Sequence, residues 1–193
     1  MIGLARYLAL LESAEKELSA ALLAVAERHA REPEIWQTAT LFARWSARHA
    51  TRVKEFRKRF GPGTDKGSRK LRNALFQGVR RDGIGLVRDL HDLSTLAHFV
   101  HLGWNASIQA AKALRNRALV DAIGEMGAET DRQMAWLRTA IAAMAAQALA
   151  VPPELFSELV ASRPKRPSSV PRRMIRESQL RRWIGLFSSV ERP

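Results

Sequence analysis

The chain has 193 residues, of which 46% are hydrophobic, so it can bury a sizeable core and disorder throughout is not expected. It carries 32 Lys and Arg residues against 19 Asp and Glu residues, and its formal net charge is +13. Such a field attracts nucleic acid, anionic lipid or acidic proteins. The sequence contains no cysteine, which excludes disulfides, thiolate metal ligands and cysteine nucleophiles.

The N-terminal residues do not resemble a secretory signal, because no charged segment precedes an apolar run there. No uninterrupted apolar run approaches the ~18 residues that a membrane span needs. We therefore expect a cytoplasmic protein without a transmembrane segment.

Alanine and leucine dominate the chain up to residue 150, and apolar side chains recur there at helical spacing. The pattern predicts four helices over residues 4–29, 34–60, 86–114 and 117–149. Each would be about 40 Å long. The first and last pairs have short connections, whereas the middle connection is longer and is predicted to hold a short helix over 68–79. These features predict an all-α fold, an antiparallel four-helix bundle over residues 1–150. The middle connection could be a simple turn or a crossover.

Residues 151–193 form a Pro- and Arg-rich tail, in which residues 174–188 could form a short amphipathic helix. The candidate interaction residues of this basic tail are Arg181, Arg182, Trp183 and Phe187. They could dock on the bundle, contact a second subunit or lie on an anionic membrane surface. We interpret them as a docking element within a homodimer.

Two ionisable residues interrupt apolar helical stripes: Glu15 in the first helix and His49 in the second. Buried carboxylates and imidazoles need partners. Because the midpoints of antiparallel helices lie at one level, further polar residues near the midpoints of the third and fourth helices could join them. The candidate metal ligands are Glu15, His49, His98, His101 and Glu129. Oxygen and imidazole donors of this kind suit Fe, Mn or Zn.

This arrangement over residues 4–149 resembles the ferritin-like superfamily, in which two helices each supply a glutamate and two each supply Glu-x-x-His for a pair of metal ions. In this chain the second-helix motif reads Ser46-Ala47-Arg48-His49, and the fourth-helix motif reads Glu129-Thr130-Asp131-Arg132. The stretch from residue 129 to 139 is similar to uncharacterised bacterial members of the superfamily. The resemblance implies a degenerate or single-metal centre rather than a working di-iron oxidase.

A metal-free alternative explains the same residues. Glu15 could pair with an arginine, or it could accept hydrogen bonds from His49 or Gln133. A buried cluster of acid, imidazole and amide would hold the helices in register without an ion.

A candidate anion site precedes the third helix and consists of Arg80, Arg81, Gly83 and Gly85. Glycines let the backbone approach a ligand closely, and the free N–H groups of a helix start attract negative charge. Alternatively, the glycines only make a tight entry turn.

The sequence leaves two main functions open, besides a protein that binds a small anion or a phosphate ligand through Arg80 and Arg81. The first is a ferritin-like bundle of unknown biochemical role with a degenerate centre. The second is an interaction protein that binds an acidic partner through residues 57–82 and the tail. Residues 57–82 hold nine basic and two acidic side chains, and residues 163–192 hold the same numbers. Nucleic acid would satisfy this charge, although no nucleic-acid-binding motif accompanies it.

Overall fold

The computed structural model describes residues 2–61, 76, 78–80 and 84–150. In this part of the chain the structure consists of four α-helices and contains no strand: α1 (Ile2–Arg28), α2 (Pro33–Phe60), α4 (Gly85–Ala113) and α5 (Arg117–Ala150). The prediction of an all-α bundle is confirmed. The helix bounds lie within two residues of those expected from the sequence. The predicted helix over 174–188 lies outside the described residues. Of the predicted helix over 68–79, only residues 76, 78 and 79 are described, and these three are not helical.

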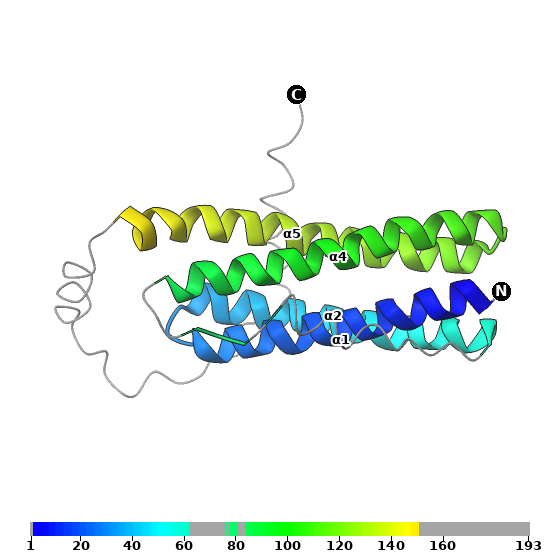
Figure 1. The fold of residues 1–193 in the computed structure, drawn as a ribbon, viewed down its shortest axis with the longest axis horizontal. Coiled ribbons are helices and arrows are strands. Elements are labelled where there is room, and N and C mark those ends of the chain that lie inside the picture. Colours follow the sequence, from blue (N-terminus) through cyan, green and yellow to red (C-terminus); the bar gives the residue numbers. More distant parts are fainter. Residues whose placement is uncertain (1, 62–75, 77, 81–83, 151–193) are drawn as a thin grey trace, which may run out of the picture. The chain divides into compact units, whose positions relative to one another are not determined.

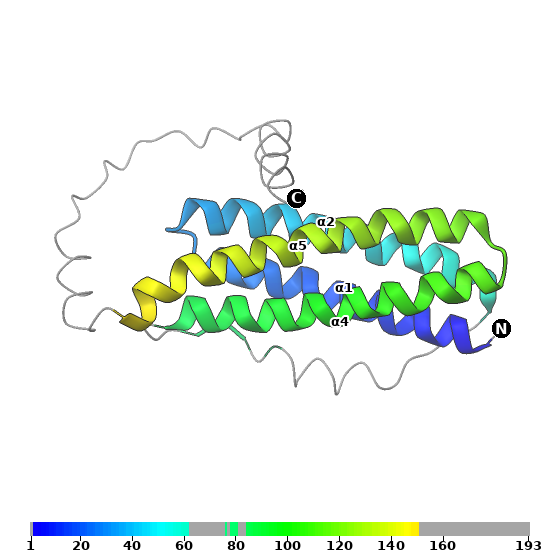
Figure 2. The same ribbon diagram turned by 90° about the horizontal axis from the view of Figure 1, so that it is seen from above.

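The helices form two hairpins, α1 with α2 and α4 with α5 (Figure 1). Between the hairpins, α1 packs on α4 along its length, whereas α2 and α5 make few contacts with each other. The C-terminal end of α2 and the N-terminal end of α4 lie at opposite ends of the bundle in both views (Figures 1 and 2). The chain between them must therefore cross from one end of the bundle to the other. This arrangement excludes the simple antiparallel turn, one of the two connections that the sequence left open.

Local sequence explains where the helices begin and end. Pro33 occupies the first turn of α2, where its missing N–H costs little. Gly61 ends α2 with a φ of 106°, a conformation that glycine adopts without strain. The side chain of Asn116 accepts a hydrogen bond from the Leu119 amide, 3.1 Å away, and caps the start of α5.

The interior is filled by leucine and aromatic side chains from all four helices. The largest fully buried side chains are those of Leu8, Leu11, Leu18, Leu22, Phe42, Leu90, Leu93, Trp104, Leu119, Ile123, Met126 and Leu137. None of the described helices combines the length and apolar composition that crossing a membrane requires.

Helix α1 approaches α4 closely at Gly103, because a Cβ atom at this position would overlap the side chain of Leu11. Leu11 is fully buried, so a shift of its side chain would have to displace close-packed neighbours. Gly124 on α5 differs, since it is exposed and a Cβ there meets no atom within 4 Å.

We predict opposite effects for two glycine substitutions. Gly103→Ala should lower the free energy of unfolding by roughly 1–3 kcal/mol, because it overpacks the α1–α4 contact. Gly124→Ala should raise it by about 0.5–1 kcal/mol, because alanine favours an exposed helix interior. Chemical denaturation of both variants measures this difference, and equal effects would contradict the close contact at Gly103.

Candidate functional site: a histidine between two glutamates

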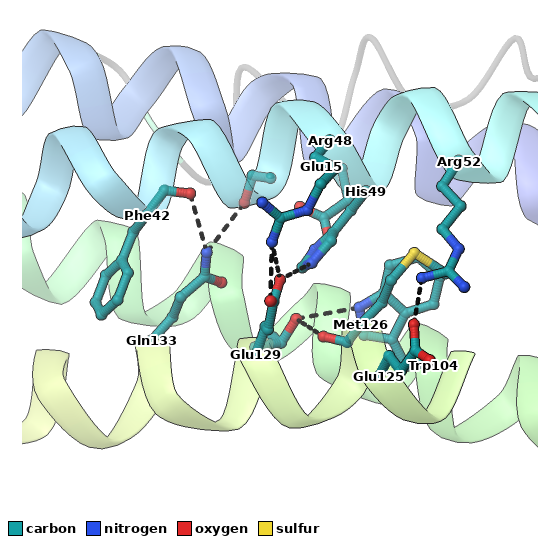
Figure 3. Close-up of polar contacts among 12 residues, drawn as sticks. Glu15, Phe42, Arg48, His49, Arg52, Trp104, Glu125, Met126, Glu129 and Gln133 are labelled. Carbon is teal, nitrogen blue, oxygen red and sulfur yellow. Dashed lines mark hydrogen bonds and ion pairs between the residues drawn. The ribbon is translucent and has the colours of Figure 1, made fainter. Parts of the chain in front are cut away.

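The polar centre of the bundle is built around His49, which projects from α2 between a glutamate of α1 and a glutamate of α5 (Figure 3). Its Nδ1 atom lies 2.9 Å from Glu15 Oε1, and its Nε2 atom lies 2.8 Å from Glu129 Oε2. Glu15 is fully buried, and only 1% of His49 is exposed. The prediction that both residues point into the bundle interior is confirmed.

Both ring nitrogens face carboxylates, and an imidazole can donate to both only when it is protonated. Burial alone would lower the pKa of His49, but the hydrogen bonds and negative charges of Glu129 and Glu15 outweigh burial and raise it to about 9. His49 is therefore an imidazolium at neutral pH.

Glu129 connects this buried pair to the surface, since its side chain is 25% exposed. Its two carboxylate oxygens also accept hydrogen bonds from the Arg48 guanidinium, at 2.8 Å and 2.6 Å. Burial alone would raise the pKa of Glu129, but the hydrogen bonds from His49 and Arg48 outweigh it and lower the pKa below its usual value. One turn earlier on α5, Glu125 pairs with Arg52. Ion pairs thus join α2 to α5 where these helices make few other contacts.

A second layer of polar contacts lies beside His49. Gln133 donates hydrogen bonds to the Phe42 carbonyl and to Ser46 Oγ, both at 3.2 Å. The indole N–H of Trp104 donates to Thr130 Oγ1 at 3.2 Å. Glu15 Oε2 and Gln133 Oε1 are buried acceptors without a hydrogen-bond partner among the described residues.

Helical spacing predicts Thr130 and Gln133 as inward residues of α5, and both are buried. In the stretch that stands in place of a Glu-x-x-His motif, Glu129 reaches His49, whereas Arg132 is exposed. The buried pair at this spacing on α5 is Thr130 with Gln133, and the corresponding pair on α2 is Ser46 with His49. The amide–imidazole–acid cluster of the sequence analysis is present in part, because Gln133 bonds Ser46 rather than Glu15.

The structure does not bring His98 and His101 to this centre. His98 is exposed, and its ring stacks on that of His101 with the centroids 6.1 Å apart. His101 lies 2.9 Å from both Asp131 and Asn105, on the outer side of α4 and α5. Helical spacing predicts Val100 and Trp104 as the inward residues of this part of α4, and both are buried.

A further buried polar cluster surrounds Asp89, which sequence reasoning missed. Asp89 is fully buried. Its carboxylate accepts hydrogen bonds from the backbone N–H and from the guanidinium of Arg80, at 3.1–3.2 Å. The same carboxylate lies 3.1 Å from His29 Nε2. Arg80 also donates to Asp92 at 2.8 Å. Two carboxylates therefore already surround the Arg80 side chain of the expected anion site. Gly85 is the buried first residue of α4, and Arg81 and Gly83 lie outside the described residues.

The other expected site, the tail residues Arg181, Arg182, Trp183 and Phe187, also lies outside the described residues. A cavity of about 180 Å³ lies between α1 and α4, lined by Glu17, Ala20, Ala21, Phe76 and Leu96. None of these lining residues belongs to the His49 cluster. We therefore treat the His49 cluster, and not this cavity, as the candidate functional site.

The donors at the bundle centre do not fit a pair of metal ions. His49 uses both nitrogens on carboxylates, and the neighbouring inward side chains are hydroxyls and an amide. Within the described ranges, no three His, Asp or Glu side chains are arranged to hold a metal ion. No protein-family model matches this chain, and neither a curated protein nor a solved structure proved similar to it.

We predict that stability depends on pH through His49 and Glu129. Because the pKa of His49 is raised in the folded state, its contribution is complete below pH 6.5 and is lost as the pH rises through about 9. This loss amounts to roughly 3 kcal/mol. Glu129 has a lowered pKa, so its contribution is present above pH 4.5 and is lost as the pH falls through the folded-state value.

Urea denaturation between pH 4 and 10 measures this dependence. His49→Gln should flatten the alkaline limb, whereas His98→Gln, which changes an exposed histidine, should leave it intact. If the wild type and His49→Gln lost the same stability between pH 6.5 and 9, the imidazolium assignment would be wrong.

Proposed function

We propose that the chain is a ferritin-like helical bundle that acts as a binding scaffold, with a protonated histidine cluster in the position of a di-iron oxidase centre. Two helical hairpins joined by one long crossover are typical of ferritin-like folds, which supports the family assignment. The observation that carries the proposal is the engagement of both His49 ring nitrogens by Glu15 and Glu129.

The inward side chains support this interpretation. A ferritin-like di-iron centre needs glutamates from all four helices and two histidines. In this bundle the buried pairs at the Glu-x-x-His spacing are Ser46 with His49 and Thr130 with Gln133. Hydroxyl and amide groups are neutral, weak ligands, and they cannot balance the charge of two divalent ions.

A single ion would have to compete with a proton. A metal binds the neutral imidazole, so His49 would first have to lose the proton that its two glutamates stabilise. With a pKa of about 9, this requirement weakens the apparent affinity at pH 7 by roughly 100-fold relative to an imidazole that is already neutral. The two glutamates that could ligate a metal ion therefore stabilise the proton on His49, and this proton competes with the metal ion.

We predict that the full chain, purified without added metal, contains far less than one equivalent of iron, manganese or zinc by elemental analysis. Reconstitution with Fe(II), Mn(II) or Zn(II), followed by desalting, should not change this result, and a chelator should leave the melting temperature unchanged. One or two bound equivalents that disappear in Glu15→Gln would overturn the proposal in favour of a metal centre.

A second candidate function is the binding of an acidic partner through residues 57–82 and the tail, and the net charge of +13 favours it. The cytoplasm would supply nucleic acid, anionic lipid and acidic proteins as partners. This function is compatible with the first, because a bundle without redox chemistry can still present charged surfaces.

We predict that the full chain binds duplex DNA, RNA or anionic vesicles with an affinity that falls steeply as salt rises from 50 to 300 mM. Arg181→Ala/Arg182→Ala should weaken this binding if the tail takes part. A binding isotherm that does not change with salt would exclude a charge-driven partner.

A further inference from the structure

One end of the bundle collects basic side chains. The N-terminus of α1, the C-terminus of α2 and the turn between α4 and α5 all lie at this end (Figures 1 and 2). Residues 2–9, 52–61 and 106–121 form it, and we refer to them as the basic end. They hold nine basic and two acidic side chains. The basic residues are Arg6, Arg52, Lys54, Arg57, Lys58, Arg59, Lys112, Arg115 and Arg117.

The opposite end of the same bundle has a different balance. Its described residues, 22–36, 78–80, 84–92 and 140–150, hold four basic and five acidic side chains. The positive charge of the bundle is therefore not spread evenly along the helices. It is concentrated where α2 ends and α4 turns into α5.

Helix dipoles explain only part of this concentration. Cations stabilise the last turns of α2 and α4, where Lys58 and Lys112 lie. Arg6 and Arg117, however, lie near the N-terminal ends of α1 and α5, where a dipole disfavours cations. A requirement for helix stability would not place basic residues at all four helix ends.

Several of these cations are not neutralised within the described part of the chain. Arg57 pairs with Glu12 and Arg117 with Asp121, each at 3.0 Å. Lys58, Lys112 and Arg115 are exposed and form no ion pair with another described residue. Their charge is therefore available to a partner.

Apolar side chains accompany these cations. Leu114, in the turn between α4 and α5, is 43% exposed and stands beside Arg115, and Phe60 at the end of α2 is half-buried. Arg115 has a φ of 52°, and the amides of Leu114, Arg115 and Asn116 all donate to carbonyls of the last turns of α4. The turn is thus closed and holds Leu114 toward solvent.

Exposed cations around an exposed leucine suit one class of partner better than others. At an anionic bilayer, Lys and Arg contact the headgroups while apolar side chains enter the acyl boundary. Duplex nucleic acid could bind these cations through its phosphates, but it would leave Leu114 without a partner.

We propose that the basic end docks on an anionic lipid bilayer, with Lys58, Lys112 and Arg115 on the headgroups and Leu114 in the interface. This inference rests on the acidic-partner function proposed above and deepens it, because it names the partner and locates the surface on the bundle. The helices would stand with this end toward the membrane, and none of them would cross it.

The test measures binding of the full chain to vesicles of phosphatidylcholine with 30% phosphatidylserine, and to vesicles of phosphatidylcholine alone. Lys112→Glu/Arg115→Glu should weaken binding to the anionic vesicles at least tenfold, because each basic residue near such a surface contributes substantially to binding. The control Arg132→Glu/Arg138→Glu makes the same charge change at exposed positions on the side of α5 and should weaken binding less than about threefold.

A second pair of variants tests the apolar contact. Leu114→Ser should weaken binding to the anionic vesicles, whereas Leu102→Ser, at a leucine that is 54% exposed away from this end, should not. Circular dichroism and melting curves confirm that each variant is folded before its binding is compared.

Three results would overturn the inference. Equal losses in both charge-reversal variants would show that only net charge matters. Binding that depends on Arg181 and Arg182 but not on Lys112 and Arg115 would preserve the acidic-partner function and reject this surface. Binding to DNA with no binding to anionic vesicles would preserve the function and reject the lipid. Failure to bind any polyanion would instead refute the acidic-partner function itself.

Discussion

The placement of His49 between Glu15 and Glu129 is the interaction on which the rest of the bundle centre depends. One imidazolium connects three helices and holds two carboxylates that burial would otherwise destabilise. Removal of one partner of such a cluster typically costs about 3–5 kcal/mol, because it leaves an uncompensated buried charge. The cluster also sets the register between hairpins, since His49 and Arg48 both contact Glu129 where α2 and α5 make few other contacts. The apolar α1–α4 contact at Gly103 joins the hairpins on the other side.

Much of the fold follows from the sequence because helical periodicity is a strong signal over long segments. Glu15 and His49 could be assigned to the interior for the same reason, since each is the only ionisable residue at the middle of an apolar stripe. The direction of the connection between α2 and α4 could not be assigned, because periodicity describes a helix face and carries no information on which ends meet.

The site was less predictable than the fold. A helical stripe is accurate to about one residue, and one residue rotates a side chain by about 100° around a helix axis. This uncertainty explains why the sequence predicts His98 and His101 at the centre, although His98 is exposed and His101 contacts Asp131 instead. Asp89 is not evident from the sequence because its partner His29 lies 60 residues away, and its partner Arg80 lies in the connection before α4, where no helical stripe applies. Only packing shows that these residues meet.

The protonation state of His49 distinguishes the two interpretations of the bundle centre. A protonated ring forms an ion-paired cluster with the two glutamates, whereas a neutral ring could ligate a metal ion together with them. A ¹⁵N NMR titration of the full chain, with the His49 signals assigned from the His49→Gln variant, measures this state directly. We expect that both ring nitrogens carry a proton at pH 7 and that the imidazolium titrates with a pKa of about 9. A neutral ring at pH 7, or signals that shift or broaden on addition of one equivalent of Zn(II) or Fe(II), would contradict it.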